Sequence, residues 1–199
     1  MPDIRQPARR GRLFILSAPS GAGKSTLCRE LRRRMPELGY SVSFTTRPPR
    51  PGEREGVDYH FIDRDTFQAG IEAGRWAEWA EVHGHCYGTS AAVVEAALAA
   101  GRDLLLDIDV QGARQLRRRF PESVTIFIEP PSLDELARRL RARGTDAEAV
   151  IARRLANAEA ELDQRHTYRY RVVNDRLEAA AARLAALVEA ERAPEAPAG

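Results

Sequence analysis

The sequence predicts an α/β fold in which helices flank a central parallel sheet. Three apolar runs, at residues 13–16, 104–109 and 124–128, are typical of strands that are buried on both faces. Helical patterns alternate with these runs along the chain, as the connections of a parallel sheet require. With 199 residues and 43% hydrophobic content, the chain is long enough to bury a sizeable core in one domain.

A glycine-rich stretch, residues 17–26, follows the first apolar run and precedes a helical pattern that begins at Leu27. Such a turn leaves successive N–H groups unpaired beside a positive helix N-terminus, so it predicts a phosphate-binding loop. We expect Lys24 to reach the β- and γ-phosphates of a nucleotide and the Ser25 hydroxyl to ligate Mg²⁺. Ala18 replaces the first glycine of the usual pattern, which leaves an ordinary turn with a surface lysine as the alternative. The residues expected to hold the phosphates here are Ala18, Pro19, Ser20, Gly21, Ala22, Gly23, Lys24, Ser25 and Thr26.

A strand-rich lobe is predicted over residues 40–90, inserted between the α/β elements. Residues 40–45 and 76–82 alternate as half-buried strands do, and residues 56–61 form another short strand pattern. Between them, residues 46–52 make a basic loop whose prolines prevent it from pairing as a central strand.

The later elements are marked by capping residues. Ser90 can cap a helix that Gly101 stops. The pairs Ser132/Glu135 and Thr145/Glu148 have capping-box spacing and predict two further helices. A last strand is expected at residues 170–174, before a closing helix with apolar residues on one face.

Composition restricts the partners and the compartment. Lys and Arg total 31 against 29 for Asp and Glu, so the net charge of +2 favours neither nucleic acid nor a membrane as partner. Cys28 and Cys86 cannot form a disulfide framework, and no apolar stretch approaches the ~20 residues that span a bilayer. With no secretory signal pattern, we expect a cytoplasmic protein whose flexible ends are residues 1–10 and 192–199.

Several separated motifs follow one another in the chain: SAPSGAGKST at 17–26, SFTTRPPRPGE at 43–53, GVDYHF at 56–61, YGTS at 87–90, LDIDVQG at 106–112, RGT at 143–145 and VND at 173–175. In these motifs the sequence resembles the guanylate kinase family, from residue 11 to about residue 189. The resemblance implies a single domain over residues 1–199 with a P-loop NTPase core at about 11–39, 91–137 and 165–191, a GMP-binding lobe at 40–90 and a helical lid at 138–164. It also implies ATP binding at residues 18–26 and transfer of the γ-phosphoryl group of ATP to GMP, and to dGMP, with Mg²⁺, giving ADP and GDP.

The basic loop then becomes a candidate clamp for the phosphate of GMP. Guanidinium groups can hold a phosphate through two parallel hydrogen bonds, and tyrosine hydroxyls can complete the site. Without the resemblance, a solvated basic loop would explain these arginines equally well. The residues that match the family's phosphate contacts are Arg47, Arg50, Tyr59 and Tyr87.

Glu78 is the candidate guanine-recognition residue. A carboxylate accepts two hydrogen bonds from the ring N–H and the exocyclic amine of guanine, whereas adenine presents an acceptor at the ring position. A solvent-facing strand acid is the alternative. Ser43 and Thr89 match family positions that contact guanine, and Asp109 is expected to assist on the same side.

The remaining candidates concern metal binding and catalysis. Asp107 suits Mg²⁺ coordination with Ser25, directly or through water, unless it only caps a neighbouring turn. Asn174 lies where the family's adenine-side loop runs. For the arginines at 138–143 and 153–154, a solvated helix face is the alternative. The resemblance implies Lys24, Arg47, Arg139, Arg143 and Arg154 as catalytic residues.

Two other functions remain open at this point. One is a nucleoside monophosphate kinase of another base specificity, and the other is a non-catalytic guanylate-kinase-like module that binds phosphopeptides. A degenerate phosphate loop or lid would favour the module, but Lys24, Ser25, Arg143 and Arg154 are all present. The oligomeric state, monomer or homodimer, is undecided.

Overall fold

The computed structural model describes residues 9–82, 84–142, 144 and 147–193. The chain divides into two compact units. The first unit comprises Met1–Leu13, Leu38–Leu106 and Arg114–Ser123, and the second comprises Phe14–Glu37, Asp107–Ala113 and Val124–Gly199.

The second unit is built on parallel strands. Strand β8 (Val124–Glu129) pairs in parallel with β1 (Leu13–Ser17) on one side and with β9 (Tyr170–Val173) on the other. Strand β1 is buried along its whole length, which explains its continuous apolar run. The helices of this unit are α1 (Lys24–Arg34), α5 (Leu133–Ala142), α6 (Glu148–Leu162) and α7 (Leu177–Arg192), with a short 3₁₀ helix at Arg165–Thr167.

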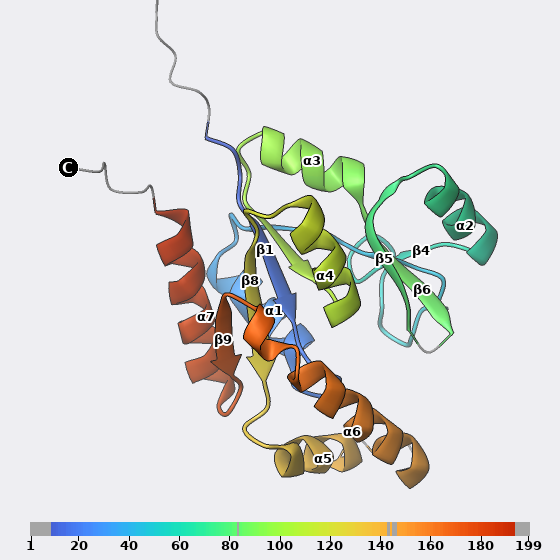
Figure 1. The fold of residues 1–199 in the computed structure, drawn as a ribbon, viewed down its shortest axis with the longest axis vertical. Coiled ribbons are helices and arrows are strands. Elements are labelled where there is room, and N and C mark those ends of the chain that lie inside the picture. The colour runs from blue at the N-terminus through green and yellow to red at the C-terminus, as the bar shows by residue number, and fades with distance from the viewer. Residues whose placement is uncertain (1–8, 83, 143, 145–146, 194–199) are drawn as a thin grey trace, which may run out of the picture. The chain divides into compact units, whose positions relative to one another are not determined.

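Two helix pairs complete the second unit. Helix α7 packs against α1 and lies beside β9 (Figure 1). Helices α5 and α6 pack on each other through a small apolar cluster of their own. That cluster contains Leu136, Leu140, Ile151 and Ala158, with Leu155 at its edge.

The first unit contains a parallel pair, β2 (Gly39–Tyr40) with β7 (Leu104–Asp107), and a separate four-stranded sheet. That second sheet has the order β4-β3-β6-β5. Phe67 stacks on Trp76 with 4.6 Å between the ring centroids and fills the core of the lobe. The other elements are β3 (Phe44–Thr45), β4 (His60–Phe61), α2 (Arg64–Glu72), β5 (Trp76–Val82), β6 (His85–Ser90), α3 (Ala91–Ala99) and α4 (Val110–Arg119), of which α4 runs from one unit into the other.

The predicted α/β fold and its parallel strands are confirmed, but two lobe strands are shorter than expected. Residues 40–45 form two strands because their partners differ: Tyr40 pairs with β7, whereas Phe44 and Thr45 pair with β6. The strand expected at 56–61 is reduced to β4. Gly56 adopts a positive φ of 69° and donates its N–H to the Tyr59 carbonyl, so this part of the chain turns.

The predicted helix starts are confirmed at two of three sites. Ser90 accepts a hydrogen bond from Val93 N–H, and Ser132 accepts one from Glu135 N–H. Thr145 lies outside the described residues, and α6 begins after Ala147 rather than at the expected cap. Among the described residues, none of the helices is long and apolar enough to cross a membrane. The division into core, lobe and lid stays a prediction.

Two adjacent valines on α3 allow the packing of the first unit to be tested. Val94→Ala should lower the free energy of unfolding by about 2 kcal/mol, because two buried methyl groups are lost. Val93→Ala, on the same helix, should change it by less than about 0.5 kcal/mol. Val94 is 0% exposed and Val93 is 49% exposed. Urea denaturation of both variants measures the difference, and equal effects would contradict this packing.

Candidate active site

The phosphate loop between β1 and α1 has a shape that only glycine permits at two positions. Gly21 and Gly23 have φ values of 92° and 88°. A Cβ atom at Gly23 would lie 2.4 Å from Nδ2 of Asn174. This close approach exists because Asn174 donates a hydrogen bond to the Ala22 carbonyl at 2.8 Å. Asn174, the residue that follows β9, therefore anchors the loop at Ala22.

The expectation that successive loop amides are unpaired is wrong for two of them. The Ala22 N–H donates to the Pro19 carbonyl at 3.1 Å, which closes a tight turn within the loop. The Ser20 N–H donates to the carboxylate of Glu161 on α6. These two donors are engaged by the protein itself.

Lys24 begins α1 and is the only lysine among the 199 residues. Its ammonium group forms an ion pair with Asp107 at the end of β7 and donates to the Ile108 carbonyl at 3.0 Å. These partners contradict the alternative of a surface lysine. One turn further along α1, the thiol of Cys28 donates a hydrogen bond to Asp107. Burial, and then the charge of Asp107, raise the pKa of this thiol well above its usual value, so it stays protonated.

Asp107, the last residue of β7, and Asp109, two residues later, have different environments. Asp109 accepts a hydrogen bond from the Gly112 N–H at 2.8 Å, which caps the start of α4. Asp107 instead faces the first two turns of α1. Turn capping, the alternative considered for Asp107, is therefore the role of Asp109, whose contribution to base binding stays a prediction.

The oxygen donors expected for Mg²⁺ have suitable chemistry. The Ser25 hydroxyl lies in the first turn of α1, next to Lys24, and Lys24 already contacts the Asp107 carboxylate. A hydroxyl and a carboxylate are ligands of the hard type that Mg²⁺ prefers. The residues present therefore fit this ion.

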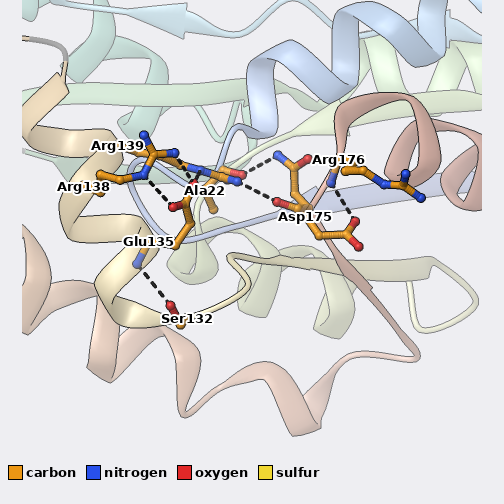
Figure 2. Close-up of polar contacts among 8 residues, drawn as sticks. Ala22, Ser132, Glu135, Arg138, Arg139, Asp175 and Arg176 are labelled. Atoms are coloured by element: carbon orange, nitrogen blue, oxygen red, sulfur yellow. Dashed lines mark hydrogen bonds and ion pairs between the residues drawn. The ribbon is translucent and has the colours of Figure 1, made fainter.

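An arginine of α5 is tied to the same loop region (Figure 2). Arg139 donates to Oε1 of Glu135 at 2.8 Å and to the Asn174 carbonyl at 2.9 Å. Arg138 also pairs with Glu135, and hydrogen bonds from Arg138 and Arg139 lower the pKa of this glutamate to about 2. The Arg138 side chain is 70% exposed, whereas that of Arg139 is 24% exposed. The solvated-face alternative thus suits Arg138 but not Arg139.

The structure says less about Arg143 and Arg154, the other two lid arginines predicted to be catalytic. Arg154 is half-buried on α6. Arg143 lies outside the described residues, so its predicted role is untested.

In the first unit, the predicted guanine-recognition residue is buried. Glu78 on β5 is 4% exposed and lies directly opposite Thr89 of β6. The Thr89 hydroxyl donates to Oε1 of Glu78 at 2.6 Å. The alternative of a solvent-facing strand acid is therefore wrong, and a buried carboxylate of this kind needs hydrogen-bond donors. For Ser43, which precedes β3, the backbone carbonyl accepts the His60 N–H at 2.9 Å, and its predicted contact with guanine stays a prediction.

The predicted phosphate clamp is organised by a residue for which the sequence suggested no role. Glu53 accepts two hydrogen bonds from the Arg47 guanidinium, at 2.8 and 2.9 Å, and one from the Arg50 N–H at 2.7 Å. Arg47 is buried, and Tyr87 forms a hydrogen bond with it. Its guanidinium lies 5.4 Å from the ring centroid of Tyr59. The solvated-loop alternative therefore fails for Arg47 and suits only the exposed Arg50.

A family model described as guanylate kinase matches residues 10–191 of this chain. The chain belongs to the guanylate kinase family. A guanylate kinase from Geobacter sulfurreducens is 54% identical over 184 residues, which cover 92% of this chain and 91% of the relative. The crystal structure of guanylate kinase from Anaplasma phagocytophilum superposes with a TM-score of 0.77 at 34% identity, covering 94% of this chain and 89% of that chain.

A more distant structure agrees on the fold alone. Shikimate kinase from Bacteroides thetaiotaomicron has a TM-score of 0.52 at 16% identity and covers 89% of this chain and 98% of its own. The expected kinase fold with a central parallel sheet is thus confirmed for this member of the guanylate kinase family.

Sequence reasoning missed three carboxylates of this guanylate kinase fold: Glu53, Glu135 and Glu161. For Glu53, a signal was available, because it follows Arg50 by three residues across a turn at Gly52, where φ is 87°. Glu135 was interpreted as half of a capping box, but its side chain pairs with Arg138 and Arg139. No local signal marked Glu161, whose partner is more than a hundred residues away in the sequence.

The Arg47–Glu53 pair predicts a pH-dependent stability. Burial alone would raise the pKa of Glu53, but hydrogen bonds from Arg47 and Arg50 outweigh it and lower the pKa below its ordinary value of 4.5. The stabilisation from ionised Glu53 is therefore present above pH 4.5 and is lost as the pH falls through the lowered pKa. The Tm of the wild type should exceed that of Glu53→Gln at pH 7, and the gap should close in acid.

Thermal melts between pH 7 and pH 2.5 measure this gap. Glu122→Gln, at an exposed site of the same unit, is the matched control and should leave Tm unchanged at every pH. A Glu53→Gln gap that stays constant with pH would contradict the ionic contribution.

Proposed function

We propose that the protein transfers the γ-phosphoryl group of ATP to GMP, and also to dGMP, giving ADP and GDP in purine nucleotide metabolism. Membership of the guanylate kinase family supports this activity. The observation that carries the choice of GMP is the buried carboxylate of Glu78 beside Thr89. Guanine can donate two hydrogen bonds to this group, whereas adenine would leave it facing an acceptor.

On the donor side, the chemistry requires positioning and charge neutralisation rather than a general base, because the attacking phosphate oxygen is already anionic. We propose that Lys24 exchanges its contact with Asp107 for the β- and γ-phosphates of ATP. The ammonium group is already at the helix N-terminus where these phosphates would bind. Asn174 and the loop glycines keep the loop in the shape that this exchange needs.

Ser25 and Asp107 are the residues that we propose for holding Mg²⁺, directly or through water. When bound, the ion neutralises charge on the β- and γ-phosphates. The Cys28 thiol contributes by fixing the orientation of the Asp107 carboxylate through its hydrogen bond.

On the acceptor side, we propose that Arg47, Arg50, Tyr59 and Tyr87 bind the phosphate of GMP. Glu53 orients the Arg47 guanidinium, so little side-chain entropy is lost when the phosphate arrives. Ser43 and Thr89, with Asp109, complete the proposed guanine site.

We propose that Arg139, Arg143 and Arg154 spread positive charge over the transferring phosphoryl group. Closure of the lid over it would exclude water and restrain hydrolysis of ATP. The contact between Arg139 and Asn174 supports this role, since Asn174 in turn contacts the phosphate loop.

The alternative functions lack comparable support. A phosphopeptide-binding module needs the clamp around Arg47 but has no use for the ion pair of Lys24 with Asp107. A kinase for another base would not use a buried acid at Glu78. A cytoplasmic location is also proposed, and the two buried free cysteines, Cys28 and Cys86, suit its reducing conditions.

The base preference can be tested with a coupled ADP-release assay. With ATP and Mg²⁺, the kcat/KM for GMP should exceed that for AMP, CMP and UMP by at least about 10³-fold, because a wrong base leaves buried polar groups unpaired. Glu78→Gln should lower the value for GMP by about 10²-fold and narrow the gap to AMP. Glu81→Gln, on an exposed site of the same strand, is the control. Equal wild-type rates with AMP would refute the role of Glu78.

The donor site can be tested at the only lysine. Lys24→Ala should reduce kcat by more than about 10³-fold, since the phosphates lose their main cationic contact. Arg29→Ala removes an exposed cation from the same helix and should keep normal turnover. Circular dichroism and calorimetry with GMP should show an intact fold and unchanged GMP affinity in both variants. Normal turnover in Lys24→Ala would disprove the assignment of the phosphate loop.

A further inference from the structure

Glu161, near the C-terminal end of α6, places an acidic side chain against the phosphate loop. Its carboxylate accepts a hydrogen bond from the backbone N–H of Ser20. The other oxygen, Oε2, is buried and has no hydrogen-bond partner among the described residues. The proposed donor site does not use this residue. An unpaired carboxyl oxygen beside a loop that is proposed to receive a polyanion needs a physical explanation.

Two charged groups face Glu161 from the elements around it. Asp109 approaches from the connection after β7, and Lys24 approaches from α1, while the loop itself contributes the Ser20 amide. Burial raises the pKa of Glu161 and outweighs the opposite effect of the Ser20 hydrogen bond. Asp109 raises the pKa further, and Lys24 lowers it. Burial and Asp109 thus favour the neutral form of Glu161, while the lysine that is proposed to bind ATP favours its charged form.

Entry of phosphates into the loop without a metal ion would favour the neutral form of Glu161. The phosphates bring negative charge close to the carboxylate, and they compete for Lys24, the cation that favours its ionised form. A proton from solvent on Oε2 would remove the repulsion and turn an unsatisfied acceptor into a hydrogen-bond donor. The Ser20 N–H can keep its bond to the other oxygen in either form.

We propose that Glu161 is a positioning residue that holds the phosphate loop through Ser20 and takes up a proton from solvent when the phosphates of ATP enter the loop. The proposal rests on the proposed function, because it names ATP as the ligand. The proton does not take part in phosphoryl transfer. It accompanies binding, so the affinity of the wild type for ATP depends on pH in a way that a neutral side chain at this position cannot reproduce.

Calorimetry of ATP binding, without GMP and without Mg²⁺, measures the proton directly. Titrations at one pH in HEPES and in Tris, whose ionisation enthalpies differ, give the number of protons bound with ATP. The wild type should take up more protons than Glu161→Gln, by as much as about one proton at the pH of the largest difference. Glu159→Gln, at an exposed site two residues earlier on α6, should match the wild type.

The sign of the pH dependence is also defined. Below the pKa of Glu161 in the free protein, the group is neutral before and after ATP binds; above it, binding must either add a proton or tolerate the repulsion. The ratio of the Kd of the wild type to that of Glu161→Gln should therefore rise with pH. Titration of ATP itself affects both proteins equally and cancels in this ratio.

Glu161→Ala tests the second part of the proposal, the hold on the loop. The Gln side chain can still accept the Ser20 N–H, but Ala cannot. Glu161→Ala should therefore bind ATP about tenfold more weakly than Glu161→Gln, since a hydrogen bond to the loop is lost. GMP affinity and the melting temperature report whether either variant has lost its fold.

Three outcomes would overturn the proposal. They are equal proton uptake by the wild type and Glu161→Gln, a Kd ratio that is constant or falls with pH, and equal ATP affinity of Glu161→Ala and Glu161→Gln when both are folded. Failure of the proposed function is distinguishable, since it would appear as absent ATP:GMP transfer in the wild type. A wild type that transfers phosphate normally but shows any of the three outcomes refutes only the role of Glu161.

Discussion

The phosphate loop passes so close to Asn174 that no side chain fits at Gly23, and the rest of the donor site depends on this constraint. The Asn174 amide holds the loop at Ala22, so α1 starts immediately beyond it with Lys24 as its first residue. From that position the ammonium group reaches Asp107 at the end of a parallel strand. Backbone geometry in one turn thus determines where the only lysine of the chain can act.

Three cations proposed to bind phosphate already have internal carboxylate partners. Lys24 is paired with Asp107, Arg47 with Glu53 and Arg139 with Glu135. Each partner offsets the charge in the absence of ligand and holds the side chain in a restricted geometry, which reduces the entropy lost on binding. For Lys24, the proposed binding of ATP exchanges the Asp107 carboxylate for phosphate, whereas Glu53 stays in place as the partner that orients Arg47. The unpaired oxygen of Glu161 belongs to the same balance of charges.

Local patterns were sufficient for much of the fold. The run at β1, the caps at Ser90 and Ser132, and the glycines of the loop were identified because each signal lies within a few residues of its effect. The strands of the lobe were predicted less accurately. Their ends depend on which neighbour offers the next hydrogen bond, and at Tyr40 that neighbour is β7, more than sixty residues away.

By itself, the sequence determined the phosphate loop, the order of strands and helices, and the residue types available for binding two nucleotides. Tertiary structure decided which carboxylate meets which cation, and that Glu78 is buried opposite Thr89 rather than exposed to solvent. The physical reason is that burial and charge pairing depend on packing between distant segments. Asn174 and Ala22 are 152 residues apart, and Glu161 meets Ser20 only because α6 folds back onto the loop.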